Sequence, residues 1–91
     1  MPKISVLMGA YNCADTIQAS IESIQAQTFT DWEMIICDDG SSDNTMEVVR
    51  ACQKNDNRII LIQNDRNRGL SYTLNHCLEE AKGEYCARMD G

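Results

Sequence analysis

The sequence predicts an α/β fold in which helices cover both faces of a mainly parallel, four-stranded sheet. Short apolar runs alternate with longer segments of helical period, in the order β-α-β-α-β-α-β. The apolar runs show no polar alternation, which is typical of parallel strands buried on both faces. The chain has 91 residues, 43% hydrophobic and 24% charged, which suits one soluble domain. We therefore expect three α/β/α layers joined by right-handed crossovers.

Four apolar runs predict the strands, and small or polar residues follow each of them. The strands are expected at residues 4–8, 32–37, 58–63 and 84–89. Gly9 follows the first run, and the turn sequence DDGSS at residues 38–42 follows the second. Residues 64–69 form a polar loop after the third run. These loops separate the strands from the predicted helices.

The segments between the strands carry apolar residues at helical spacing. The first helix is expected to have Asn12 as its N-cap, and its buried stripe consists of Ala14, Ile17, Ile21 and Ile24. The second is expected to begin after Asp43 or Asn44, with Glu47 placed to complete a capping box. The third helix ends before Gly83, and its stripe consists of Leu70, Leu74, Cys77, Leu78 and Ala81.

The chain is acidic, with eight basic residues, 14 acidic residues and a formal net charge of -6. This balance argues against binding to nucleic-acid phosphates, so no nucleic-acid partner is expected. A phosphorylated small molecule would need a cation to separate the like charges. The five cysteines are odd in number and lack CxxC spacing, which favours free thiols in a cytoplasmic protein. No apolar run is long enough to predict a signal peptide or a membrane span.

Polar residues gather where the parallel strands are expected to end, and ligands bind beyond the carboxyl ends of such strands. The residues expected at that edge are Tyr11, Asp38, Asp39, Arg66, Arg68 and Asp90. Taken singly, each has an ordinary structural explanation, such as a capping aspartate or a solvated arginine. One cap does not need two adjacent carboxylates, so either Asp38 or Asp39 is expected to point elsewhere. His76, on the third predicted helix, is expected at the surface.

The motifs of several common enzyme classes are missing. The first strand–helix junction reads MGAYN, without the GxGxxG glycines that bring a backbone close to a dinucleotide. The chain also has no GxxxxGK[ST] loop and no GxSxG nucleophile elbow. The sequence therefore gives no support to a dehydrogenase, a P-loop enzyme or a serine hydrolase.

Several segments, in order along the chain, resemble the family-2 inverting glycosyltransferases. The segments are ISVLMGAYN (4–12), SIQAQTF (23–29), WEMIICDDGSSDNT (32–45), NRG (67–69), Asn75 and AKGEYCARMD (81–90). The resemblance implies the Rossmann-like, nucleotide-diphospho-sugar-binding half of a GT-A domain, with strand order 3-2-1-4. Residues 1–91 are then the N-terminal part of a glycosyltransferase domain, truncated at the Asp-x-Asp motif.

The resemblance also implies roles for individual residues. Tyr11 matches the position whose ring packs against the base, and Asp39 matches the acid that hydrogen-bonds the base edge. Asp90 matches the first acid of the Asp-x-Asp motif, close to the ribose and a Mg²⁺ or Mn²⁺ ion. The chemistry agrees, because a carboxylate accepts the imide N–H of uracil and a tyrosine ring stacks on it. The implied nucleotide-binding set is Ala10, Tyr11, Asn12, Asp39, Arg68, Gly69 and Asp90, with Asp90 also on the metal.

The implied function is transfer of a sugar, with inversion, from a nucleotide-diphospho-sugar, expected to be a UDP-sugar, to an acceptor hydroxyl. The expected partners are this donor and a carbohydrate or glycoconjugate acceptor in cell-surface polysaccharide synthesis, at the cytoplasmic face of the membrane. The second acid of the motif and the family's catalytic base would follow Gly91, so no catalytic residue is assigned. We expect weak nucleotide binding without turnover, and self-association through the uncovered fourth strand.

Two other classes of protein also fit acids gathered at strand ends. A phospho-acceptor signalling domain carries its acid pair after the first strand, whereas the pair here follows the second, and Asn64 with Asp65 is a poor acceptor site. The other class is a non-catalytic interaction module whose acidic edge binds a protein. Loss of nucleotide binding in an Asp39→Ala variant that still folds would favour the transferase over both.

Overall fold

The computed structural model describes residues 2–90, and of Asp90 it describes only the backbone. Its elements are β1 (Ile4–Ala10), α1 (Ile17–Gln25), β2 (Trp32–Asp38), α2 (Thr45–Asn55), β3 (Ile59–Gln63), α3 (Leu70–Glu80) and β4 (Tyr85–Asp90). The predicted order of strands and helices is confirmed, with most boundaries within two residues. The largest difference is at the start of the first helix.

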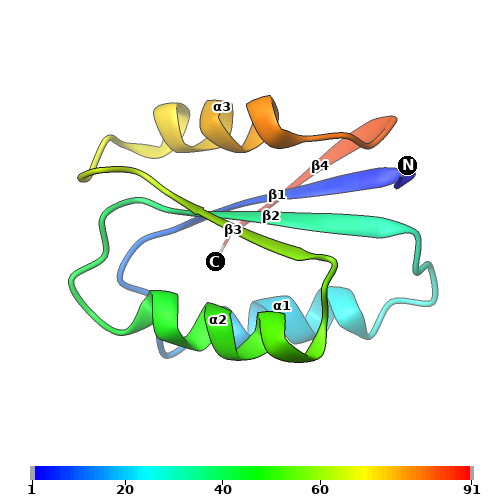
Figure 1. The fold of residues 1–91 in the computed structure, drawn as a ribbon, viewed down its shortest axis with the longest axis horizontal. Coiled ribbons are helices and arrows are strands. Elements are labelled where there is room, and N and C mark those ends of the chain that lie inside the picture. The colour runs from blue at the N-terminus through cyan, green and yellow to red at the C-terminus, as the bar shows by residue number, and fades with distance from the viewer. Residues whose placement is uncertain (1, 91) are drawn as a thin grey trace.

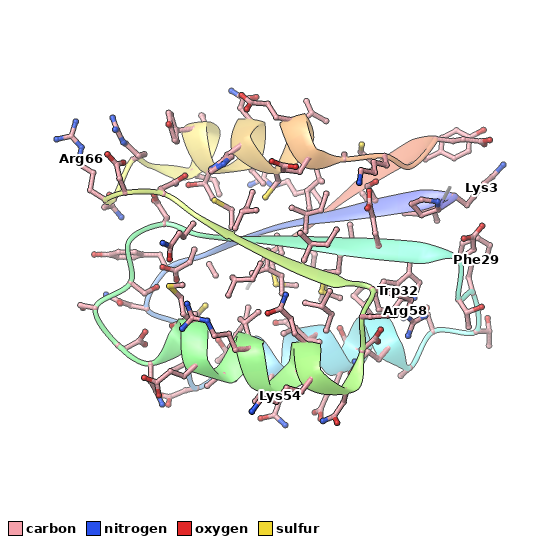
Figure 2. All side chains as sticks on the ribbon, in the orientation of Figure 1. Lys3, Phe29, Trp32, Lys54, Arg58 and Arg66 are labelled. Carbon is pink, nitrogen blue, oxygen red and sulfur yellow. The ribbon has the colours of Figure 1, made fainter. Side chains whose placement is uncertain are left out.

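The strands form one sheet in the order β3-β2-β1-β4, and every neighbouring pair is parallel. The predicted α/β class and the 3-2-1-4 order are therefore confirmed. Figure 1 shows α1 and α2 on one face of the sheet and α3 on the other. The connections that follow β1, β2 and β3 gather at one end, and side chains fill the spaces between the layers (Figures 1 and 2).

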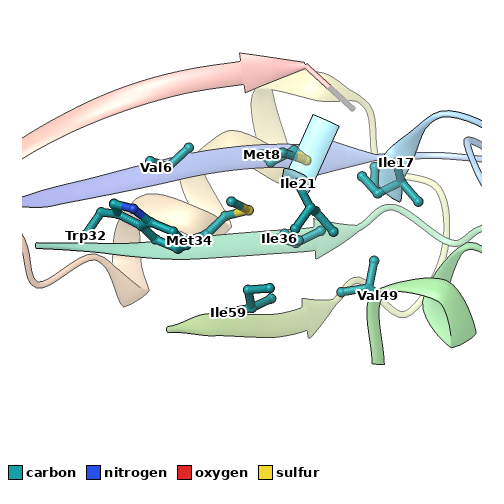
Figure 3. Close-up of a cluster of buried hydrophobic side chains, with 10 residues drawn as sticks. Val6, Met8, Ile17, Ile21, Trp32, Met34, Ile36, Val49 and Ile59 are labelled. Atoms are coloured by element: carbon teal, nitrogen blue, oxygen red, sulfur yellow. The ribbon is translucent and has the colours of Figure 1, made fainter. Parts of the chain in front are cut away.

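The core has two parts, one on each face of the sheet. Ten buried residues from the sheet, α1 and α2 form the larger part, including Met8, Ile21 and Met34 (Figure 3). The smaller part lies under α3 and consists of Leu7, Ile35, Cys37 and Cys77. Successive side chains of a strand point to opposite faces, so both faces of the central strands need apolar residues. All seven residues of β2 are buried, which explains its apolar run from Met34 to Cys37.

The first helix begins at Ile17 rather than directly after Asn12, so the predicted cap is wrong. Asn12 has a backbone φ of 47°, in the left-handed region that asparagine tolerates better than most residues. Its side-chain oxygen accepts hydrogen bonds from the backbone N–H groups of Ser42 (2.8 Å) and Asp43 (3.4 Å). Asn12 therefore ties two strand-end loops together instead of capping a helix.

The second helix begins at Thr45, and Asp43 provides its side-chain contact. The Asp43 carboxylate accepts a hydrogen bond from the backbone N–H of Thr45 at 3.0 Å, and the Thr45 hydroxyl also donates to it. Asn44 occupies the N-cap position but makes no side-chain cap bond. Of the two predicted caps, Asp43 is therefore the one that satisfies a backbone donor of α2.

A buried carboxylate at the start of β2 holds the turn between α3 and β4. Glu33 is 6% exposed, and its Oε2 accepts hydrogen bonds from the Ser5 hydroxyl and the Lys82 backbone N–H, both at 2.6 Å. The Ser5 oxygen in turn accepts the Gly83 N–H at 2.8 Å. A Cβ at Gly83 would lie 2.6 Å from the Ser5 backbone nitrogen, so the close approach requires glycine.

Arg58 covers the core at the end of the sheet where Glu33 lies. Its guanidinium lies 3.7 Å from the ring centre of the buried Trp32, and the labelled side chains are adjacent in Figure 2. The Nε and Nη2 atoms donate to the two oxygens of Asp56 at 2.9 and 2.8 Å, and Nη1 donates to the Thr30 carbonyl at 3.0 Å. This bidentate contact is the main reason why the pKa of Asp56 falls to about 2.

We predict that Asp56→Asn lowers the free energy of unfolding near pH 7 by on the order of 2 kcal/mol. Because folding lowers the pKa of Asp56, its contribution is present above the unfolded pKa of about 4 and is lost as the pH falls towards 2. Urea unfolding of both chains from about pH 7 to about pH 2 measures this. The two chains should converge at low pH, and a difference that does not change with pH would contradict the assignment.

Candidate functional site

A pocket of about 270 Å³ lies where the carboxyl ends of β1 and β2 meet the start of α3. It is lined by Gly9, Ala10, Tyr11, Asp39, Asn67, Gly69, Leu70 and Thr73. The structure therefore brings together four of the seven predicted nucleotide-binding residues, which come from three separate parts of the chain. This is the edge at which parallel α/β sheets bind ligands.

Tyr11 and Ala10 form the β1 side of the pocket. Tyr11 is 51% exposed, so its ring is available to a ligand. Ala10 is buried, and its carbonyl oxygen accepts the backbone N–H of Asp39 at 2.8 Å. This hydrogen bond continues the β1–β2 pairing beyond Asp38 and places Asp39 beside Tyr11. Asn12 does not line the pocket, and its side-chain oxygen accepts a hydrogen bond from the Ser42 backbone N–H instead.

Asp39 is the charged group of the pocket, although only 5% of its surface is exposed. Its Oδ1 accepts hydrogen bonds from the Arg68 backbone N–H (2.7 Å) and from Asn64 Nδ2 (2.8 Å). Its Oδ2 accepts the Gly69 N–H at 3.0 Å. Burial alone would raise the pKa of Asp39, but these donors outweigh burial and lower it. Asp39 is therefore a buried carboxylate that stays charged.

The neighbouring Asp38 has a different role. Its carboxylate accepts the Ser41 hydroxyl at 2.5 Å and the Ser41 backbone N–H at 3.0 Å, so it closes the loop before α2. The two adjacent acids therefore point to different partners, as expected. Asp38 orders the loop, and Asp39 lies at the pocket.

Arg68 contributes its backbone rather than its side chain. Its guanidinium pairs with Asp65 at 3.0 Å and lies 5.2 Å from the ring centre of Tyr72, and the residue does not line the pocket. Arg66 points away from the molecule (Figure 2). Gly69, with a φ of 94°, turns the chain into α3 and donates its N–H to Asp39. The loop thus meets the pocket through backbone N–H groups.

The sequence places Asn64 in the loop at this edge but assigns no role to it or to Thr73, and it places His76 at the surface. Asn64 is 7% exposed, and its Nδ2 also donates to the hydroxyl of the buried Thr73 at 3.0 Å. His76 is half-buried, and its Nδ1 lies 2.8 Å from Asn64 Oδ1, so it lies only partly at the predicted surface. The position of Asn64 directly after a strand was the signal that could have indicated a role at the site. Nothing in the helical spacing distinguishes His76 from a solvated residue.

At the end of β4, the backbone of Asp90 pairs with that of Gly9, which lines the pocket. Its side chain lies outside the described part of the structure, so its predicted contacts with ribose and metal stay predictions. Within the described residues, no three His, Cys, Asp or Glu side chains gather as a metal site. One or two carboxylates together with phosphate oxygens are sufficient ligands for Mg²⁺.

A larger hollow of about 450 Å³ lies on the outer surface between α1 and α2, away from the strand ends. Its two acids, Glu22 and Glu47, are exposed, and it lacks a buried charged side chain like that of Asp39. We therefore place the functional site at the strand ends, where the smaller pocket holds the buried carboxylate.

The family model of glycosyl transferase family 2 matches residues 5–91, almost the whole chain. The chain belongs to this family. Family-2 relatives include EpsE of Bacillus subtilis, named as a glycosyltransferase, which is 51% identical over 99% of this chain. WfaP of Escherichia coli, a UDP-Glc:alpha-D-GlcNAc-diphosphoundecaprenol beta-1,3-glucosyltransferase, is 42% identical over 99% of the chain. The chain spans about a third of the length of these curated relatives, 33% of EpsE and 35% of WfaP.

A solved mannosyltransferase structure matches the fold closely. The mannosyltransferase PcManGT from Pyrobaculum calidifontis, in complex with GDP-Man and Mn²⁺, superposes with a TM-score of 0.92 at 27% identity. The match covers 98% of this chain and 27% of that one. The predicted GT-A fold is therefore confirmed. In the part of this chain that the structure describes, no helix is both long enough and apolar enough to cross a membrane.

The loop that presents Asp39 passes very close to the loop before α3. Gly40 has a φ of 77°, and a Cβ there would lie 2.6 Å from the Asn67 backbone nitrogen and 2.8 Å from the Arg66 carbonyl carbon. Gly69 has a φ of 94°, but a Cβ there would meet nothing within 4 Å. Both glycines have a positive φ, and they differ in crowding.

We predict that Gly40→Ala lowers the free energy of unfolding by roughly 3 kcal/mol, because a backbone clash adds to the strain of the positive φ. Gly69→Ala is the matched control and should cost about 1 kcal/mol, since only the strain applies. Urea unfolding measures both values. Equal losses in the two variants would contradict the close approach of the two loops.

Proposed function

We propose that this chain binds the nucleotide of a nucleotide-diphospho-sugar, and that the protein containing it transfers the sugar to an acceptor hydroxyl with inversion. The observation that carries the proposal is the charged Asp39 carboxylate, held in the pocket beside the exposed ring of Tyr11. Membership of a transferase family and the buried bonds of Asp39 favour this function over a phospho-acceptor domain or an interaction module.

The base is proposed to bind between Tyr11 and Asp39. A carboxylate has about four acceptor positions, and the chain fills three of those on Asp39. The remaining position, on Oδ2, would accept the imide N–H of uracil, while the Tyr11 ring stacks on the base. Uracil is our choice because the name of WfaP specifies a UDP-sugar donor, although PcManGT was solved with GDP-Man.

The diphosphate is proposed to bind with Mg²⁺ or Mn²⁺ held by Asp90, because a cation must separate the diphosphate from the acidic strand ends. The ion would stabilise the negative charge that the leaving diphosphate acquires. Support for a divalent ion comes from the Mn²⁺ in the PcManGT complex. The residues of this chain would then bind the base and the ribose and would provide one ligand to the metal.

The relatives support a proposal for the acceptor and the cellular site. WfaP acts on a diphosphoundecaprenol-linked sugar, as its name states. We propose a similar glycoconjugate acceptor for this protein, reached at the cytoplasmic face of the membrane. Because the chain spans about a third of its relatives, we assign it the donor-binding role and no catalytic base.

We predict that UDP with Mg²⁺ binds this chain weakly and shifts the amide resonances of Ala10, Tyr11 and Gly69 in a nuclear magnetic resonance titration. Tyr11→Ala should weaken the binding by about tenfold, since stacking of a base on an aromatic ring contributes roughly 1–3 kcal/mol. Tyr85→Ala is the matched control, because Tyr85 is 63% exposed at the start of β4, at the opposite end of the strand from Asp90.

The control variant should bind UDP as the unaltered chain does. The proposal would be contradicted if UDP shifted no resonance at the strand-end pocket, or if both tyrosine variants lost binding equally. A parallel titration with GDP tests the choice of base: tighter binding of GDP would contradict uracil but leave nucleotide binding intact.

A further inference from the structure

A chain of hydrogen bonds runs from the pocket to the half-buried His76 of α3. Asp39 Oδ1 accepts a bond from Asn64 Nδ2 at 2.8 Å, and Asn64 Oδ1 lies 2.8 Å from Nδ1 of His76. Asn64 Nδ2 also donates to the Thr73 hydroxyl at 3.0 Å, and the Cys37 thiol donates to Asn64 Oδ1 at 3.4 Å. All four hydrogen-bonding positions of the Asn64 amide are therefore used.

The direction of every bond in this network follows from Asp39. A charged carboxylate only accepts hydrogen bonds, so the Asn64 atom facing it must be the NH₂ group. The Asn64 oxygen then faces His76, and Nδ1 of His76 must carry a proton in order to donate to it. The hydrogen bonds of the Thr73 hydroxyl are consistent with this orientation of the Asn64 amide. The hydroxyl donates its proton to the Gly69 carbonyl at 2.8 Å, so it can only accept from Asn64.

The imidazole of His76 is also held from its other side. The ring of Tyr72 lies edge-on to it, with ring centres 6.4 Å apart and planes at 70°. His76 is half-buried and lies outside the residues that line the nucleotide pocket. Its shortest route to that pocket is the 2.8 Å contact with Asn64, and Nδ1 also lies 3.6 Å from the Cys37 sulfur.

We propose that His76 is a positioning residue for the nucleotide site, acting through Asn64 to hold Asp39 in the orientation that receives the base. By fixing the Asn64 amide, the Nδ1–H group keeps Oδ1 of Asp39 occupied and leaves the open acceptor position on Oδ2. The inference rests on the proposed function, since it concerns the same pocket. Neither the sequence motifs nor the pocket lining assigns a role to His76.

The first test needs neither a ligand nor a variant. The ¹⁵N chemical shifts of the imidazole distinguish the Nδ1–H form of a neutral histidine from the Nε2–H form. The network requires Nδ1–H in the neutral imidazole of the unaltered chain. An Nε2–H form would overturn the proposal, because His76 could then not donate to Asn64.

The second test compares two variants of the same size and shape. His76→Asn keeps a nitrogen donor attached at Cγ, where Nδ1 is attached in histidine, whereas His76→Leu has the same branching and no donor. We expect UDP, with Mg²⁺ present, to bind His76→Leu roughly fivefold more weakly than the unaltered chain, the effect of one lost hydrogen bond. Binding to His76→Asn should stay within about twofold. Equal affinities in the two variants would overturn the positioning role.

The outcome also separates this inference from the proposed function. If the unaltered chain bound neither UDP nor GDP, the proposed function would fail. The positioning role would then be tested without a ligand, by three resonances compared between the unaltered chain and the variants. These are the resonances of the Asn64 side-chain amide and of the Arg68 and Gly69 backbone N–H groups. These resonances should move in His76→Leu and return towards their original positions in His76→Asn. Resonances that stay unchanged in His76→Leu would overturn it.

Discussion

The structure depends on one buried charge, the Asp39 carboxylate, and on the N–H groups that surround it. Two of these donors, the backbone N–H groups of Arg68 and Gly69, directly precede α3. A negative charge at this point also suits the positive end of the helix dipole. At the other end of α3, Glu33 accepts the N–H of Lys82. The acids at the two ends of β2 therefore hold α3 against the sheet by both of its ends.

This arrangement explains why the site and the fold share residues. The bonds that fix α3 also bring Gly69 and Leu70 against Gly9 and Tyr11, and the pocket is the space left between them. The division of roles among the polar residues follows from burial. Buried Asp39 supplies a charge of fixed position, while the exposed ring of Tyr11 is available to a flat ligand.

The fold and the location of the site could be predicted from the sequence, because hydrophobic periodicity reports burial and the carboxyl ends of parallel strands share one edge. The family resemblance was confirmed as well. What could not be predicted was the partner of each side chain. Asn12 looks like a helix cap, but its left-handed backbone turns it towards the next loop, and His76 is read as solvated although Asn64 binds it. Both depend on contacts between residues distant in the sequence, which no local pattern records.

The most direct test of this account is the pKa of Asp39, measured from the pH dependence of its carboxyl ¹³C resonance. Burial without adequate donors would raise this pKa, and the observed set of N–H donors lowers it. The account predicts a pKa below the ordinary aspartate value of about 3.9, so that the carboxylate is charged at neutral pH. A pKa at or above that value would contradict it, because Asp39 would then lack the hydrogen bonds on which α3 and the pocket both depend.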